Sequence, residues 1–265
     1  MKQNEVIYLP FTGIEFTVTD RMQELETECL RLLDKLNPVI SFGVKMKLEA
    51  ELSASISNNY KDYAYAFENA RFDECILEAL NFQFKSPSTS VQAVANTWAL
   101  LTSNRDCKFK HKPNTLDKIQ RILKDTDNVI FTKYPIVGAA FAHLAFSSVA
   151  PYIDANCALA RIMLYVALAS KHPTVWNCSI SHAIKCYNQM LYCSALTTTP
   201  TFAIESLMKL IYAALCYAYI EQEVGDSWKS NTDDITVFLY HNCNIGHIDD
   251  LIKVIKEDSN NVCSL

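Results

Sequence analysis

Apolar residues recur every three or four positions over most of the chain, which is the spacing of one face of an α-helix. Thr19 and Asp20, residues typical of a helix N-terminus, precede a predicted helix. A second helix is predicted over residues 43–57, and a third begins at Pro200 behind Thr199. The stripe of the first comprises Met22, Leu25, Cys29, Leu32, Leu33 and Leu36, and that of the third comprises Ile204, Leu207, Met208, Ile211, Leu215 and Ala218. The pattern predicts an all-α protein.

Few segments depart from the helical pattern. Short extended segments are expected near residues 5–11 and 128–132, and the polar segments 84–92 and 104–115 predict loops. We expect one helical domain over residues 1–225 and a small helical appendage over residues 226–265.

The middle of the chain is the most apolar part. Residues 135–149 carry one titratable group, His143, and residues 157–169 carry one charged side chain, Arg161. Helices that are apolar on all sides are buried, so these two segments predict a central helix hairpin joined by a short loop.

A buried arginine needs a partner, because an uncompensated buried charge costs several kcal/mol. The candidates for Arg161 are Asp154, an acid from another element, or an anion bound at the helix N-terminus. The residues alone leave two interpretations open: a structural Asp154–Arg161 pair with Asn156 as helix cap, or an anion site.

Composition excludes several classes of function. Of 265 residues, 24 are basic and 29 acidic, and half are apolar, which excludes a disordered tail protein. The net charge of −5 argues against non-specific nucleic-acid binding. The five glycines all lie more than ten residues apart, which excludes the glycine-rich phosphate loops of P-loop and dinucleotide-binding folds.

The ten cysteines are scattered, with neither a CxxC pair nor zinc-ligand spacing. Cys29, Cys186 and Cys216 lie in helical patterns, where a thiol acts as a small hydrophobic group. This predicts a reducing compartment. With no secretory signal or clean membrane span visible, we expect a cytoplasmic protein, or one delivered to a host cytosol without a signal, and no membrane partner.

Residues 139–161, AAFAHLAFSSVAPYIDANCALAR, resemble the signature HPFx(D/E)GNGRxxR of the Fic (fido) family and the helix AAxAHxxFxxI before it. Upstream, KLEAELSASISNN resembles the family's autoinhibitory segment EAxxSSxIEGT, predicting an inhibitory-helix-like segment at about residues 43–59. Downstream, residues 179–215 resemble the tyrosine-rich stretch and closing helix. The three blocks cover residues 15–222 in order, although residues 60–115 align poorly. The resemblance implies a Fic-like helical domain.

The resemblance also shows which catalytic groups are missing. The signature histidine, the family's general base toward a target hydroxyl, is replaced by Ala150. Ala155 and Cys157 replace the two glycines that let backbone amides approach the nucleotide phosphates, and Ala158 replaces the first arginine. The expectation is that no catalytic base is present.

Three signature residues are retained. By resemblance, Asp154 matches the Mg²⁺-binding acid, and Asn156 and Arg161 match nucleotide-binding groups. In the upstream segment Ser57 replaces the inhibitory glutamate, which in the family pairs with the arginine matched by Arg161. Loss of both the general base and the inhibitory glutamate is typical of an enzyme that has lost its activity.

Two residues of the hairpin and one loop are further candidates for chemistry. Cys157 could be a nucleophile near a helix N-terminus, but a small apolar filler is the favoured interpretation. His143 is favoured as a satisfied core histidine. The basic run at residues 108–112 is interpreted as a solvated loop rather than a partner-binding one.

The resemblance therefore implies a catalytically degenerate Fic-fold protein, a pseudoenzyme by the family mechanism, acting through protein binding or weakened nucleotide binding. The alternative is a Fic-type nucleotidyltransferase that transfers AMP to protein hydroxyls by non-standard chemistry, with Mg²⁺ and ATP as cofactors. A third hypothesis is a helical scaffold in which Arg161 pairs with a protein acid. We expect a protein partner, with homo-oligomerisation left open.

Overall fold

The computed structural model describes residues 4–38, 43–59, 72–102, 114–152, 154–187, 192, 196–225, 248–250 and 252–253. Two strands form an antiparallel hairpin, β1 (Glu5–Leu9) and β2 (Ile14–Val18), with Ile7 opposite Phe16. The helices are α1 (Asp20–Lys35), α2 (Val44–Asn59), α3 (Phe72–Lys85), α4 (Val91–Leu101), α5 (Thr115–Thr126), α6 (Ile130–Lys133), α7 (Pro135–Val149), α8 (Asn156–Ala169), the 3₁₀ helix η2 (Pro173–Asn177), α9 (Ile180–Tyr187) and α11 (Pro200–Val224).

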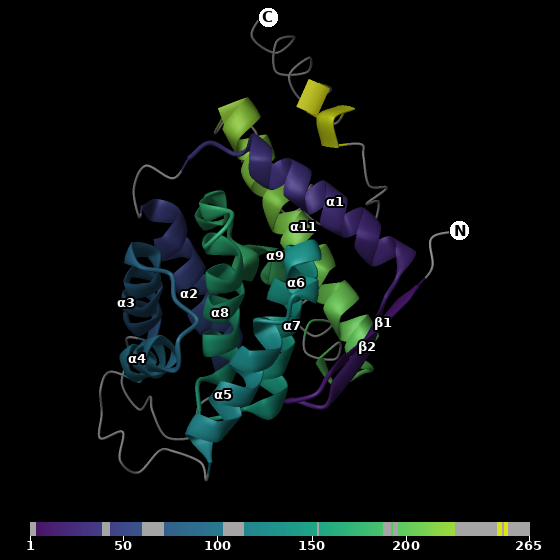
Figure 1. The fold of residues 1–265 in the computed structure, drawn as a ribbon. Coiled ribbons are helices and arrows are strands. Elements are labelled where there is room, and N and C mark those ends of the chain that lie inside the picture. Colours follow the sequence, from purple (N-terminus) through teal and green to yellow (C-terminus); the bar gives the residue numbers. More distant parts are fainter. Residues whose placement is uncertain are drawn as a thin grey trace, which may run out of the picture.

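The predicted helix hairpin lies at the centre of the molecule. In Figure 1, α7 and α8 lie between α2, α3 and α4 on one side and α1, α11 and the β-hairpin on the other. Every residue of α7 from Ile136 to Phe146 is buried, and so is α8 except at Cys157 and Ala167. The all-α prediction is confirmed, with one small sheet added.

Local sequence signals account for the helix boundaries. Thr19 Oγ1 accepts a hydrogen bond from the Met22 amide at 3.1 Å and caps α1, as predicted. The extended segment expected at residues 128–132 is wrong, because α6 forms there. Asn128 Oδ1 accepts a hydrogen bond from the Ile130 amide and so starts this helical turn.

The predicted loops are partly confirmed. Residues 86–90 connect α3 to α4, a shorter loop than the predicted 84–92. Most of the expected loop 104–115, including the basic run at 108–112, lies outside the described residues, and α5 begins at Thr115. Asp249, in a described helical turn near the C-terminus, accepts hydrogen bonds from Arg31 and Lys35 of α1. The predicted boundary at residue 225 stays a prediction.

Helix α11 is long and apolar enough to cross a membrane by length and composition, alone in this respect among the described helices. However, 78% of its most apolar window is buried inside the protein. The burial is that of a core helix, packed against α1, α7 and α9.

The start of α7 is capped by a buried carboxylate from another helix. Glu26 of α1 accepts hydrogen bonds from the amides of Ile136 at 2.9 Å and Val137 at 3.0 Å. These amides have no acceptor within their own helix, so Glu26 satisfies two donors that burial would otherwise leave unpaired. Burial outweighs the two hydrogen bonds and raises the pKa of Glu26 to about 7.

The raised pKa of Glu26 predicts a specific pH dependence of stability. Between about pH 4.5, the ordinary value, and about pH 7, folded Glu26 holds its proton while the unfolded chain releases it. Stability therefore falls as pH rises through this window, by about 3 kcal/mol from this group. Urea unfolding at several pH values measures this effect. We expect the free energy of unfolding of wild type to fall with rising pH relative to that of Glu26→Gln. The lowered pKa of His143 makes stability rise with pH instead, but His143 is present in both proteins, so its contribution cancels in the difference.

The prediction would be contradicted if the two proteins had parallel stability profiles across that window. It would also be contradicted if the difference grew toward higher pH in favour of wild type, because that would mean that Glu26 has a lowered pKa in the folded protein.

Candidate functional site

The loop that joins α7 to α8 carries two alanines in the left-handed backbone region. Ala150, at the end of α7, has φ 43°, and Ala155, immediately before α8, has φ 57°. This conformation costs an L-residue with a Cβ about 1–2 kcal/mol, which is why glycine is preferred there. Ala155 therefore occupies a backbone position that favours glycine, the residue that the family signature has at this position.

Trp98 of α4 holds this loop in place. Its indole ring stacks on the Tyr152 ring at 4.1 Å with an interplanar angle of 3°, and its Nε1 donates a hydrogen bond to the Asp154 carbonyl at 3.1 Å. Thr115, at the start of α5, donates a hydrogen bond from its Oγ1 to the Pro151 carbonyl at 2.8 Å. The loop is thus anchored by two helices distant from it in sequence.

The side-chain amide of Asn156 is engaged within the loop. Its Oδ1 accepts a hydrogen bond from the Tyr152 amide, and its Nδ2 donates one to the Tyr152 carbonyl, both at 3.0 Å. Asp154, two residues earlier, is 1% exposed, and both of its carboxylate oxygens are buried. Neither side chain is presented to solvent.

Arg161 lies on α8 and reaches across to α2. Its Nε donates a hydrogen bond to Ser53 Oγ at 2.8 Å, and its Nη2 donates to the Ser53 carbonyl at 2.9 Å and to Ser57 Oγ at 2.6 Å. The arginine is 1% exposed. Ser57, which replaces the inhibitory glutamate in the resemblance, therefore still meets this arginine, through a neutral hydroxyl.

Glu49, one helical turn before Ser53 on α2, is a second buried titratable group in this region. It accepts hydrogen bonds from Ser179 Oγ at 2.7 Å, from the Ser181 amide at 2.9 Å and from Ser181 Oγ at 2.6 Å, at the N-terminus of α9. Burial raises the pKa of Glu49, while these hydrogen bonds and the charge of Arg161 oppose the rise. Arg161 is therefore close enough to an acid from another element to affect its pKa.

His143 is a core histidine, as its sequence context predicts. It is fully buried on α7, and its Nε2 lies 2.7 Å from the hydroxyl of Tyr192. Burial and the charge of Arg161 lower its pKa to about 3, so the ring is neutral near pH 7. Cys157, the other candidate for chemistry, is a half-buried free thiol at the start of α8.

In this arrangement the retained signature residues do not fit a magnesium-bound nucleotide. Mg²⁺ is usually bound through one or two accessible carboxylates and several waters, whereas the Asp154 oxygens are buried. The Asn156 amide is used by Tyr152, and the Arg161 guanidinium is held by α2. The metal assignment of Asp154 and the nucleotide assignments of Asn156 and Arg161 stay predictions.

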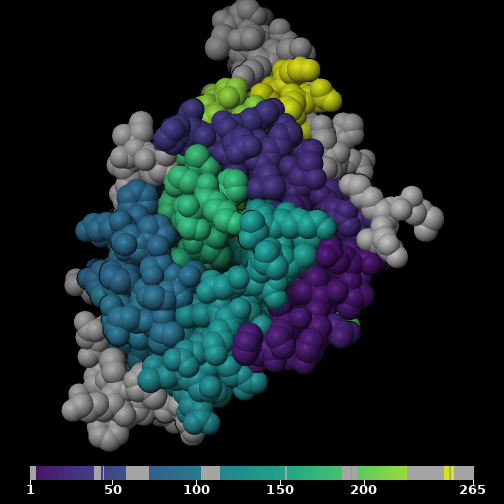
Figure 2. Space-filling model, viewed as in Figure 1, coloured from purple at the N-terminus to yellow at the C-terminus, as the bar shows by residue number. Residues whose placement is uncertain are grey.

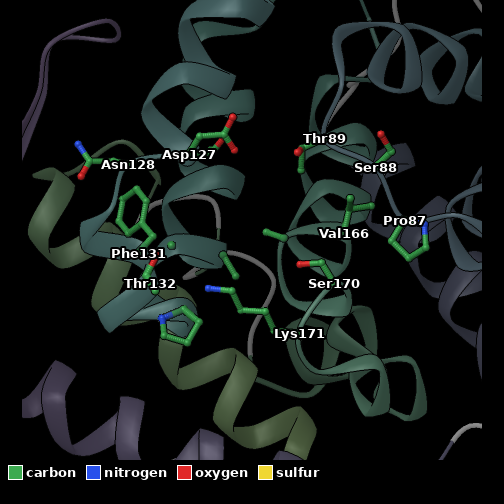
Figure 3. A pocket seen from close by; sticks show the side chains of 15 residues that line it. Pro87, Ser88, Thr89, Asp127, Asn128, Phe131, Thr132, Val166, Ser170 and Lys171 are labelled. Atoms are coloured by element: carbon green, nitrogen blue, oxygen red, sulfur yellow. The ribbon is translucent and has the colours of Figure 1, made fainter.

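A surface cavity of about 270 Å³ lies at the opposite end of the hairpin. Figure 2 shows the segments around it, α3–α4, α6–α7 and α8, meeting on one face of the molecule. Figure 3 shows Asp127 and Lys171 at opposite ends of the cavity, with Phe131 and Val166 on facing walls. The sequence contained no signal for this cavity, which is separate from the α7–α8 loop.

The buried hairpin, the flanking α2 and the closing helix α11 define a Fic-like helical fold. The crystal structure of a Fic family protein from Desulfovibrio desulfuricans G20 matches this chain with a TM-score of 0.63 and 13% sequence identity. The match covers 78% of this chain and 77% of that one. No protein-family model and no curated protein matches the sequence. At this identity the likeness shows the fold alone, so function is argued from the site.

Sequence reasoning missed Trp98, Thr115 and Glu49 as residues that build this site. Trp98 and Thr115 lie in or next to the stretch where the family resemblance is weakest, and they act on backbone carbonyls that no motif reports. Glu49 offered a signal, because it aligns with the first glutamate of the autoinhibitory segment. Its three hydrogen bonds at α9 explain that position structurally.

The left-handed backbone at Ala150 predicts that glycine stabilises the loop. Ala150→Gly is expected to raise the free energy of unfolding by about 1 kcal/mol, because glycine adopts this conformation without a Cβ penalty. Ala155→Gly is the matched comparison, with a smaller gain because it also removes a fully buried methyl group. Urea unfolding of both variants measures the difference. A destabilised Ala150→Gly protein would show that its backbone is not left-handed.

Proposed function

We propose that this chain is a catalytically degenerate Fic-fold protein that works by binding another protein rather than by transferring a nucleotide. The observation that carries the proposal is the Arg161 guanidinium, which is buried and bonded to Ser53 and Ser57 of α2. In the family resemblance this arginine serves the nucleotide phosphates. Here its Nε and Nη2 are already hydrogen-bonded to α2.

The position of the general base supports the same proposal. Ala150 carries a methyl group, which cannot accept a proton from a target hydroxyl. His143, the nearest histidine along the chain, is buried two turns back in α7 and bonded to Tyr192, so it is not placed to replace the base. Proton abstraction by the family mechanism therefore has no candidate in this loop.

The contacts of α2 support a helix that stays in place permanently rather than one that is displaced. Two hydroxyls of α2 bond Arg161 on α8, and Glu49 of the same helix bonds the N-terminus of α9. Displacing α2 would leave a buried guanidinium and a buried carboxylate without these partners, at a cost of several kcal/mol. The helix acts as part of the core.

Titration of the full-length chain with Mg²⁺ and ATP, followed by intact-mass analysis, tests the proposal. We expect no binding heat and no AMP adduct on the chain or on proteins of an added lysate. Transfer of AMP to any protein by the purified chain would overturn the proposal and establish the alternative, a nucleotidyltransferase with non-standard chemistry. That alternative also predicts Mg²⁺-dependent binding that is lost in Asp154→Asn.

A restored signature provides the positive comparison. The variant Ala150→His, Ala155→Gly, Cys157→Gly, Ala158→Arg returns the four missing groups to the loop while leaving α2 intact. We expect it to stay inactive until Ser57 or Ser53 is also replaced by a bulkier residue that displaces α2. Activity in the fourfold variant alone would show that α2 does not obstruct the site.

A further inference from the structure

A cysteine and a histidine lie side by side on α9, away from the α7–α8 loop. Cys186 Sγ lies 3.4 Å from His182 Nε2. The two residues are four apart on one helix, so both side chains project from the same face. Both are half-buried, so the sulfur is neither sealed in the core nor fully solvated. The interpretation of Cys186 as a small hydrophobic filler is therefore incomplete.

Three other cysteines of the described part of the chain have a different environment. Cys29, Cys178 and Cys216 are fully buried. Burial raises the pKa of the Cys178 thiol to about 12 and that of Cys29 well above its ordinary value. A thiol reacts as its thiolate, so these cysteines are inert near neutral pH.

The histidine is held in a defined position. The His182 amide donates a hydrogen bond to Ser179 Oγ in the capped first turn of α9. Its ring packs edge-on against the Tyr217 ring of α11, with centroids 4.5 Å apart and an interplanar angle of 68°. An imidazole fixed by a third group and placed against a thiol is the arrangement that activates a cysteine nucleophile.

We propose that Cys186 is a covalent-modification site whose thiolate is formed with the help of His182 and which takes low-molecular-weight disulfides of the glutathione type. The proton of the Cys186 thiol passes to His182 Nε2. The thiolate attacks one sulfur of the disulfide, whose S–S bond breaks as the mixed disulfide forms. The departing thiolate takes up the proton from His182, so atoms and electrons balance with the disulfide as the oxidant consumed.

The test treats the full-length, folded chain with oxidised glutathione near neutral pH and follows each cysteine by mass spectrometry. Tandem fragmentation is needed because Cys186 and Cys193 share one tryptic peptide. We expect Cys186 to be modified while Cys178 stays free. In His182→Gln less of the Cys186 thiol is deprotonated, but the thiolate that does form is intrinsically more nucleophilic. The net result expected is that modification of Cys186 slows about threefold. The rate at half-buried Cys157 is expected to stay unchanged.

A second measurement needs no variant, so it stands even if His182→Gln fails to fold. In wild type, the modification rate of Cys186 is expected to fall less steeply between mildly alkaline and mildly acidic pH than that of Cys157. An unmodified Cys186, a rate insensitive to His182→Gln in folded protein, or a pH profile as steep as that of Cys157 would each overturn the proposal.

Discussion

Replacing Trp98 with alanine is expected to lower the free energy of unfolding by about 3–5 kcal/mol, as for a large aromatic side chain removed from a core. The change removes the ring that stacks on Tyr152 and the N–H that bonds the Asp154 carbonyl. It also leaves a cavity, because Trp98 is among the largest fully buried side chains. Urea denaturation followed by circular dichroism measures the loss.

Trp98→Phe is the matched control for this prediction. A phenyl ring keeps most of the apolar contact with Tyr152 but cannot donate to the Asp154 carbonyl. We expect it to cost about 1–2 kcal/mol, mostly for the carbonyl left without its donor. Equal losses in the two variants would show that stacking contributes little. A loss in Trp98→Ala below that expected for the phenylalanine would show that α4 does not anchor the loop.

Replacing Arg161 with methionine is the second large effect, and we expect a loss of about 3–5 kcal/mol, because it breaks a buried network of charge-assisted hydrogen bonds. Methionine retains the apolar stem of the side chain, but the Ser53 and Ser57 hydroxyls lose their donor. The buried Glu49 carboxylate loses the positive charge that favours its ionised form. Urea unfolding of the variant, compared with wild type at the same pH, measures the loss.

A double-mutant cycle separates charge from packing. In the Glu49→Gln background, Arg161→Met is expected to cost at least about 1 kcal/mol less, because no uncompensated carboxylate remains. Arg21→Met, which removes a surface ion pair with Glu24, is the control and is expected to change stability by less than about 1 kcal/mol. Strict additivity of the two core substitutions would mean that Glu49 and Arg161 do not interact.

The confirmed predictions of helices and of the buried hairpin depend on local periodicity. The stripe from Met22 to Leu36 predicts a helix because residues three and four apart share a face, and every residue of that stripe is buried. The segments that became α7 and α8 predict burial because they are apolar on all sides apart from His143 and Arg161. The extended segment expected at residues 128–132 is wrong because α6 forms there, and a helix of four residues is too short for periodicity to detect.

The hydrogen-bond partners of Arg161 are a feature that local sequence patterns do not predict. The sequence required a partner for a lone buried arginine, and Asp154 was the nearest acid along the chain. Hydrogen bonds from Arg161 go to Ser53 and Ser57, which are 108 and 104 residues away. Serine hydroxyls give no signal by composition or spacing. The family resemblance set Ser57 opposite this arginine, but only the packing of α2 against α8 shows that both serines bond it.

The sequence by itself determined the helices, the buried hairpin and the absence of a base at Ala150, because each depends on residue type and short-range spacing. The tertiary structure decided what the retained polar groups do. It directed Asn156 to Tyr152, Arg161 to α2 and the Cys186 thiol to His182. The physical reason is that a buried polar group must be satisfied by whichever groups the packed helices bring within hydrogen-bonding distance, and that proximity is a property of the whole fold.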